Sequence, residues 1–165
     1  MQTVEKSIVD FFHVVKNYEN LASLVRNKKL QPRILDFYIC QYSKNSPQLF
    51  QVKVEGEYCG LSDVYSSYKL QLKGYHKRWF NLFSKGKVVR LVHEGEVIEM
   101  ALARANVYKW LIISEVFEMI LTQLPDIHSE YSKHRKKILK NKKANVAKRG
   151  KMKSFLKNPL LVMRL

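Results

Sequence analysis

The chain has 165 residues, and 46% of them are hydrophobic, which excludes a wholly disordered protein and is normal for one globular domain with an appendage. Its formal net charge is +16, and that charge is unevenly placed. Residues 1–130 hold all 14 acidic residues and 17 basic ones, whereas residues 131–165 hold 13 basic residues and no acidic one. We therefore expect a single mildly basic domain over residues 1–130 and a basic arm over residues 131–165 that favours a polyanion or an acidic protein surface.

Several classes of function find no support in the composition. No apolar run approaches the roughly 20 residues of a membrane span, so we expect none, and the N-terminus does not resemble a secretory signal. The five histidines are scattered, and no phosphate-binding glycine loop is present. We therefore expect no enzyme activity, no cofactor and no metal site. Cys40 and Cys59 indicate small buried residues in a reducing compartment, and a disulfide between them requires their flanking strands to pair.

The first third of the chain predicts a helix followed by a hairpin. Apolar residues recur at spacings of three and four over Thr3–Arg26, which predicts one uninterrupted helix that ends before Pro32. Ile34–Tyr42 is rich in β-branched and aromatic residues, and Leu49–Tyr58 alternates between apolar and polar residues. With Lys44–Pro47 as the connection, these two stretches predict an antiparallel hairpin.

A second helix should begin at Ser62, as its N-cap, and end or bend at Gly74. The stretch from Val64 to Phe83 is both aromatic and basic and has no acidic residue. Helical spacing places three of its lysines on one ridge able to contact phosphates, and an arginine follows; these residues are Lys69, Lys73, Lys77 and Arg78.

The aromatic residues of the same stretch have two interpretations. Tyr75, Trp79 and Phe80 are of the type that stacks on nucleobases. The alternative, which we favour, is that the aromatic side chains belong to the hydrophobic core and that the lysines are simply the solvated face of a helix.

The second half of the chain predicts a hairpin and two helices. Lys87–Leu102 contains two apolar runs around a turn at Gly95, which is suited to positive φ. Ala103–Leu124 is apolar on nearly all sides and predicts a central buried helix ended by Pro125. Asp126–Lys143 predicts a polar, increasingly basic helix. The fold class is therefore α+β, with two antiparallel β-hairpins, three to four α-helices and the basic C-terminal arm.

The arm combines many positive charges with an apolar end. Its basic residues are candidates for binding nucleic acid or an acidic surface: Lys133, Arg135, Lys136, Lys137, Lys140, Lys142, Lys143, Lys148, Arg149, Lys151 and Lys153. Its apolar tip is a candidate protein-docking segment: Phe155, Leu156, Leu160, Leu161, Val162 and Met163. In isolation the arm should be extended or a frayed helix. The tip docks on a neighbouring chain, returns to this domain's own sheet or stays disordered.

One stretch resembles a known family. Residues 64–80 resemble the pattern V-Y-x-x-Y-K-x-Q-L-K-x-Y-x-K-x-x-F of an uncharacterised family in nucleocytoplasmic large DNA viruses of the iridovirus, marseillevirus and phycodnavirus type. The matching residues are Val64, Tyr65, Tyr68, Lys69, Gln71, Leu72, Lys73, Tyr75, Lys77 and Phe80. The resemblance extends through Val107-Tyr108-Lys109-Trp110 to about Lys143, with Asn81-Leu82 where the family tends to show Asp-Pro.

The resemblance implies a viral protein made in the host cytoplasm and located in the virion. Together with the segregated charge and the apolar tip, it favours a non-enzymatic structural component, a minor capsid or core protein. Such a protein contacts capsid or other virion proteins and is a possible oligomer within an assembly. The alternative is a protein that contacts nucleic-acid phosphates in genome packaging or late transcription.

Overall fold

The computed structural model describes residues 3–54 and 57–156, with side chains over 3–51 and 60–147. The chain divides into two compact units, Met1–Ile127 and His128–Leu165. Helices and two separate two-stranded antiparallel sheets make up the described residues, so the α+β class is confirmed.

The N-terminal segment forms two helices, α1 (Val4–Phe12) and α2 (Val15–Arg26), instead of the single helix expected. The backbone of Val14 is extended at the break. The side-chain amide of Asn17 donates to the carbonyl of Phe11 at 2.9 Å, which satisfies an acceptor that the end of α1 leaves open. Because α1 and α2 both pack on α6, the break lets each helix present its apolar side to the core.

The expected strand over Ile34–Tyr42 is helical, so that prediction is wrong. The segment folds as α3 (Pro32–Phe37), one π-helical turn, η1 (Tyr38–Tyr42), and α4 (Ser43–Asn45). Proline is well suited to the first position of a helix, because its fixed φ is helical and its missing N–H has no partner there. Burial follows a helical period, and packing overrides the β propensity; the buried residues of α3 and η1 are Ile34, Leu35, Phe37, Tyr38 and Ile39.

The first hairpin pairs β1 (Leu49–Val54) with β2 (Glu57–Asp63). The chain thus turns back within Leu49–Tyr58, the stretch expected to be one strand. Strand β1 pairs with β2 and not with Ile34–Tyr42. The register pairs Leu49 with Asp63 and shifts between Val52 and Lys53. Helix α5 (Val64–Gly74) follows directly. Its N-cap is Asp63 rather than Ser62, because Asp63 Oδ1 accepts from the backbone N–H of Ser66 at 2.9 Å.

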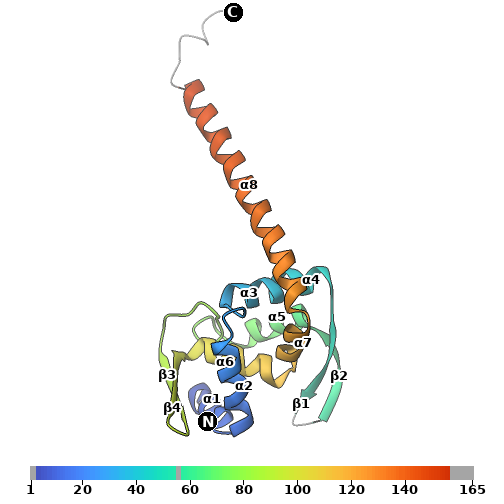
Figure 1. Ribbon diagram of the computed structural model, residues 1–165, viewed down its shortest axis with the longest axis vertical. Helices are drawn as coiled ribbons and strands as arrows, with labels where there is room; N and C mark the ends of the chain where they lie inside the picture. The colour runs from blue at the N-terminus through green and yellow to red at the C-terminus, as the bar shows by residue number, and fades with distance from the viewer. Residues whose placement is uncertain (1–2, 55–56, 157–165) are drawn as a thin grey trace, which may run out of the picture. The chain divides into compact units, whose positions relative to one another are not determined.

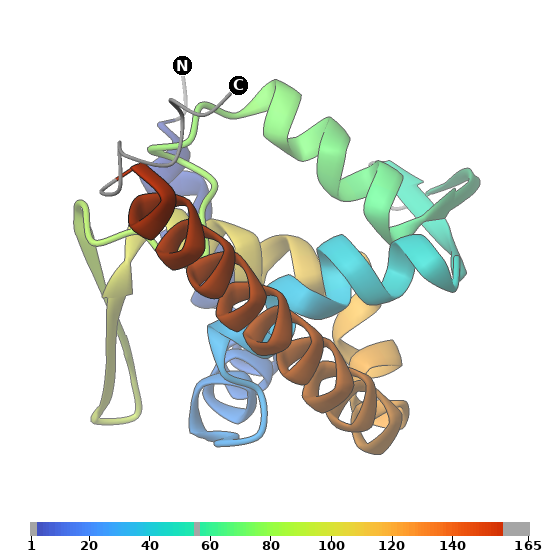
Figure 2. The same ribbon diagram turned by 90° about the horizontal axis from the view of Figure 1, so that it is seen from above.

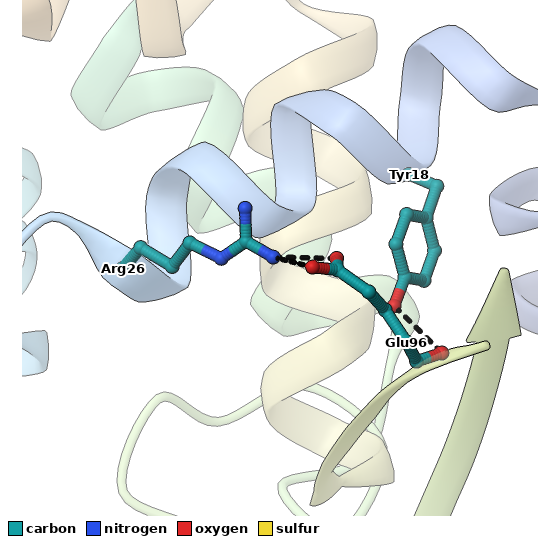
Figure 3. Close-up of polar contacts among 3 residues, drawn as sticks. All are labelled: Tyr18, Arg26 and Glu96. Atoms are coloured by element: carbon teal, nitrogen blue, oxygen red, sulfur yellow. Dashed lines mark hydrogen bonds and ion pairs between the residues drawn. The ribbon is translucent and has the colours of Figure 1, made fainter. Parts of the chain in front are cut away.

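The second hairpin confirms the expected turn. Strands β3 (Val88–His93) and β4 (Glu96–Ala101) are antiparallel, and the turn residues Glu94 and Gly95 have φ of 47° and 83°. The hairpin is tied to α2 at its tip, where the Tyr18 hydroxyl donates to the Glu96 carbonyl at 3.2 Å and Arg26 forms an ion pair with the Glu96 carboxylate (Figure 3).

The helix expected over Ala103–Leu124 is interrupted. It consists of α6 (Leu102–Ile113) and α7 (Val116–Thr122), separated at Ser114 and a left-handed Glu115 with φ of 59°. Ser114 Oγ donates to the carbonyl of Trp110 at 2.7 Å, which satisfies an acceptor at the end of α6. The long helix α8 (Leu124–Leu156) begins next.

Helix α6 is the centre of the first unit, as its apolar sequence predicted. The two hairpins lie on opposite sides of it (Figures 1 and 2). An aromatic cluster joins α5, the following loop and α6: the ring of Phe80 lies 5.6 Å from that of Tyr68 and 6.1 Å from that of Trp110. Phe80 is 1% exposed, which places this cluster in the core.

Candidate nucleic-acid interface

Helix α8 carries most of the candidate binding residues. Among residues 128–147 the basic side chains are Lys133, Arg135, Lys136, Lys137, Lys140, Lys142 and Lys143, and the acidic one is Glu130. Glu130 is engaged within the helix, because its carboxylate accepts from Lys133 Nζ at 2.7 Å. Every residue from 135 to 147 is exposed. The structure therefore presents the predicted basic residues up to Lys143 to solvent on one helix.

The charges surround most of the helix instead of forming one stripe. With 3.6 residues per turn, Lys133, Lys137 and Lys140 lie on one side, whereas Arg135 and Lys142 lie on another. The sector without lysine or arginine carries Ile138, Asn141 and Asn145. Side chains spread in this way can reach phosphates on more than one side of the helix.

The helix is longer than expected and continues beyond Lys143 to Leu156. The segment is rich in lysine, alanine and other good helix formers, and its first proline is Pro159, so local propensity favours continuation. Residues in this extension have a helical backbone, and their side chains lie outside the described part: Lys148, Arg149, Lys151, Lys153, Phe155 and Leu156. The rest of the docking tip, Leu160, Leu161, Val162 and Met163, lies outside the described residues altogether.

The expected ridge on α5 is shorter than predicted. Lys69 and Lys73 are exposed one turn apart, but α5 ends at Gly74 and Tyr75 is extended. Lys77 therefore leaves the ridge and lies with Arg78 in the following exposed loop. Lys69 Nζ lies 5.4 Å from the centre of the Tyr65 ring, and Lys44 Nζ from α4 lies 5.6 Å from it.

The aromatic residues of the stretch belong mainly to the core, the alternative that we favoured. Phe80 is buried, and the Tyr75 ring stacks on it with centroids 5.7 Å apart and planes 11° apart. The Arg78 guanidinium lies 5.5 Å from the Trp79 ring. The carbonyl of Trp79 accepts from the buried Asn106 amide at 2.8 Å, which fixes the loop to α6. Base stacking by Phe80 is excluded by its burial.

The described residues also bear on metal, membrane and thiol chemistry. Within residues 3–54 and 57–156, no three histidine, cysteine or acidic side chains gather closely enough to hold a metal ion. No helix in that part of the chain has the length and apolarity to cross a membrane. Cys40 is a free thiol on η1, and burial raises its pKa to about 11. Because Ile34–Tyr42 is not a strand, the strand pairing that a disulfide to Cys59 requires does not occur.

A model of one protein family matches residues 1–158, nearly the whole chain. The chain belongs to the family of unknown function DUF7197. An uncharacterised protein of Acanthamoeba polyphaga mimivirus is 24% identical over 152 residues, which cover 88% of this chain and 58% of the relative. This DUF7197 chain thus spans less than two thirds of that relative. No solved structure matches significantly.

The viral relative is consistent with the resemblance to uncharacterised proteins of large DNA viruses. The DUF7197 match extends further than that resemblance, because it includes the N-terminal helices.

Proposed function

We propose that this DUF7197 protein is a non-enzymatic viral protein that binds nucleic acid through the phosphate backbone. The observation that carries the proposal is the exposed basic helix α8, with seven lysines and arginines and one internally paired acidic residue over residues 128–147. The mimivirus relative supports the viral setting.

The composition of α8 favours affinity over sequence specificity. Six of its seven lysines and arginines in that range are lysines. A lysine ammonium acts as a compact point charge, whereas bidentate recognition of guanine uses arginine. Contacts of this kind release counterions, so the logarithm of the binding constant should fall with the logarithm of salt concentration by about 0.9 per neutralised phosphate of duplex DNA.

The test compares two variants of the full chain with equal loss of charge. Glutamine retains good helix propensity, so it removes charge without favouring loss of the helix. The test variant replaces Lys136, Lys137, Lys140 and Lys143 by Gln. The control replaces four exposed lysines of the first unit by Gln: Lys6, Lys16, Lys44 and Lys85.

Binding to a random-sequence 20-base-pair duplex is measured across a salt series. In the α8 variant, the slope of the logarithm of the binding constant against the logarithm of salt concentration should be shallower by about 3 to 4, as expected for four lost phosphate contacts. In the control variant, this slope should become shallower by less than 1. Equal reductions in both variants would mean that net charge, not α8, determines binding, and would overturn the proposal.

A second candidate is a minor capsid or core protein, favoured by the exposed apolar residues of the two hairpins. Leu49 and Leu61 are 64% and 65% exposed and lie diagonally on one face of the β1–β2 pair. Val92 and Val97 are paired and exposed on the β3–β4 hairpin. Two-stranded sheets gain little stability alone, and contact with neighbouring virion proteins would cover these faces.

This candidate has its own test. Replacing Leu49 and Leu61 by Thr keeps β propensity and removes apolar surface. In infected cells this variant should be lost from purified particles while binding duplex DNA normally. Normal incorporation would eliminate this hairpin as a capsid contact. Removal of residues 144–165 tests the docking role of the tip in the same assay.

A further inference from the structure

A pocket of about 370 Å³ lies in the first unit, between the end of α2, the loop to α3, strand β4 and helix α6. Its volume falls in the range of small-molecule sites. Apolar side chains form much of its lining, including Leu24, Leu30, Pro32 and Met100. The pocket can therefore accommodate an apolar group.

Tyr108 is the buried polar residue of this pocket. Its side chain is 4% exposed, and its hydroxyl has no hydrogen-bond partner among the described residues. No described side-chain oxygen or nitrogen that is sealed from solvent lacks a partner, so this hydroxyl retains some contact with solvent, and Tyr108 is one of the residues that line the pocket. Burial raises the pKa of Tyr108, which keeps the hydroxyl protonated and able to donate at neutral pH. A buried hydroxyl normally finds a partner, and a water molecule or a ligand group in the pocket can supply one here.

Arg104 lies one helical turn before Tyr108, so both side chains arise from the same side of α6. Its Nε donates to the carbonyl of Leu82 at 2.8 Å, which holds the guanidinium in place. Its two terminal nitrogens have no hydrogen-bond partner in the part of the chain that the structure describes. Lys28 adds a second positive charge to the lining.

The acidic residue of the lining has a basic partner of its own. Glu99 Oε1 lies 3.4 Å from Nε of Arg90, so its carboxylate is directed into a cross-strand ion pair. With Glu99 directed toward Arg90, the charged lining residues without a charged partner among the described residues are Arg104 and Lys28, and they give the pocket a positive balance.

We propose that this pocket binds a small organic anion, whose carboxylate or phosphate accepts hydrogen bonds from Arg104 and the Tyr108 hydroxyl. The apolar body of the ligand packs against Leu24, Leu30 and Met100. A planar guanidinium donates two parallel hydrogen bonds to either group, which is why the two anion types share this chemistry. The site is independent of α8 and of the proposed nucleic-acid binding.

The probes share one apolar body and differ in their charged group. Benzoate and phenyl phosphate carry the two anions, and benzyl alcohol is the neutral control. Titration calorimetry with the full chain should detect at least one anion binding tenfold or more tightly than the alcohol. The tighter anion identifies the natural class. Failure of both anions to bind at millimolar concentration, or equal binding of the alcohol, would overturn the proposal.

Substitutions of single residues test whether the anion binds in this pocket. Tyr108→Phe removes only the hydroxyl and should weaken the anion about tenfold or more, as expected for a hydrogen bond to a charged group. Tyr65→Phe, a hydroxyl deletion on α5, should leave the anion's affinity unchanged. If Tyr108→Phe does not fold, Arg104→Lys keeps the charge but loses the planar fork, and should weaken binding by a similar factor. Unchanged affinity in the folded variant refutes the site.

Discussion

Gln48 and Gln123 form a reciprocal pair of hydrogen bonds: Gln48 Nε2 donates to Gln123 Oε1 at 2.7 Å, and Gln123 Nε2 donates to Gln48 Oε1 at 2.5 Å. The two residues lie 75 positions apart, before β1 and at the end of α7. Both side chains are partly buried. The pair fixes the end of α7 at the point where α8 begins.

Replacing either glutamine by Ala should destabilise the protein by about 1 to 2 kcal/mol, because the remaining amide loses both hydrogen bonds of the pair in a partly buried site. The loss should be smaller for Gln123→Ala, because Gln48 Oε1 still accepts from the Tyr38 hydroxyl at 3.5 Å. Replacing both should cost less than the sum of the two single changes, since neither amide is then left unsatisfied. Urea unfolding of the two single variants and the double variant measures this coupling. Gln41→Ala, at an exposed position of η1, is the control and should change stability little. Strict additivity would show that the pair does not act as a unit.

The N-cap of α5 predicts a pH dependence. Hydrogen bonds from Ser66 hold the pKa of Asp63 below its usual value. A folded-state pKa below the unfolded one stabilises the protein fully above the unfolded pKa, near 4, and this stabilisation is lost as pH falls through the folded value. Asn is an equally good N-cap without a titrating group. Asp63→Asn should therefore be less stable than the parent protein at pH 7, and the difference should shrink as pH falls below about 4, as measured by urea unfolding. A difference that stays constant with pH would contradict this explanation.

The two hairpins show what the sequence could and could not predict. The tripeptide Glu-Gly-Glu occurs at residues 55–57 and 94–96. Apolar runs flank the second one clearly and predict a turn. Alternation begins before the first one and predicts a continuous strand, for which the β propensity of Ile34–Tyr42 predicts a pairing partner. Local β propensity could not reveal that Ile34–Tyr42 pairs with no strand and packs as a helix.

The two candidate sites, the basic helix α8 and the pocket beside α6, also differ in how far the sequence predicts them. Composition alone predicts that the basic residues of α8 are exposed, because lysines in a segment with almost no acidic partner must face solvent. The pocket was missed, although α6 contained a signal: Arg104 and Tyr108 are polar residues four apart on a helix that is otherwise largely apolar. That spacing places them on one side of α6, but only the fold shows that α2 and β4 enclose the space in front of them.

The turn of the second hairpin offers a stabilising substitution. Glu94 has φ of 47° and precedes Gly95 at 83°, so both central residues are left-handed. Asn-Gly is the preferred pair for such a turn, because Asn tolerates positive φ better than Glu does. Glu94→Asn should raise the free energy of unfolding by about 0.5 to 1 kcal/mol. Glu94→Gln removes the same charge without that preference and should have less effect. Equal stabilisation by both variants, in thermal or urea unfolding, would attribute the gain to charge instead of backbone conformation.

The aromatic cluster provides a final prediction, which separates core packing from nucleic-acid contact within residues 75–80. Phe80 touches Tyr68, Tyr75 and Trp110 and is almost fully buried. Phe80→Ala should therefore destabilise the protein by about 3 to 5 kcal/mol, through lost burial and the cavity that remains.

Trp79 is the matched comparison, because it lies next in the chain but is only partly buried and is covered by Arg78. Trp79→Ala should cost clearly less stability than Phe80→Ala in urea unfolding. It should also leave the affinity for single-stranded DNA within about twofold, since loss of a true stacking residue costs about 1 to 3 kcal/mol, roughly 5-fold to more than 100-fold in affinity. A tenfold loss of affinity in folded Trp79→Ala would return this loop to the nucleic-acid interface and would show that α8 is not its sole part.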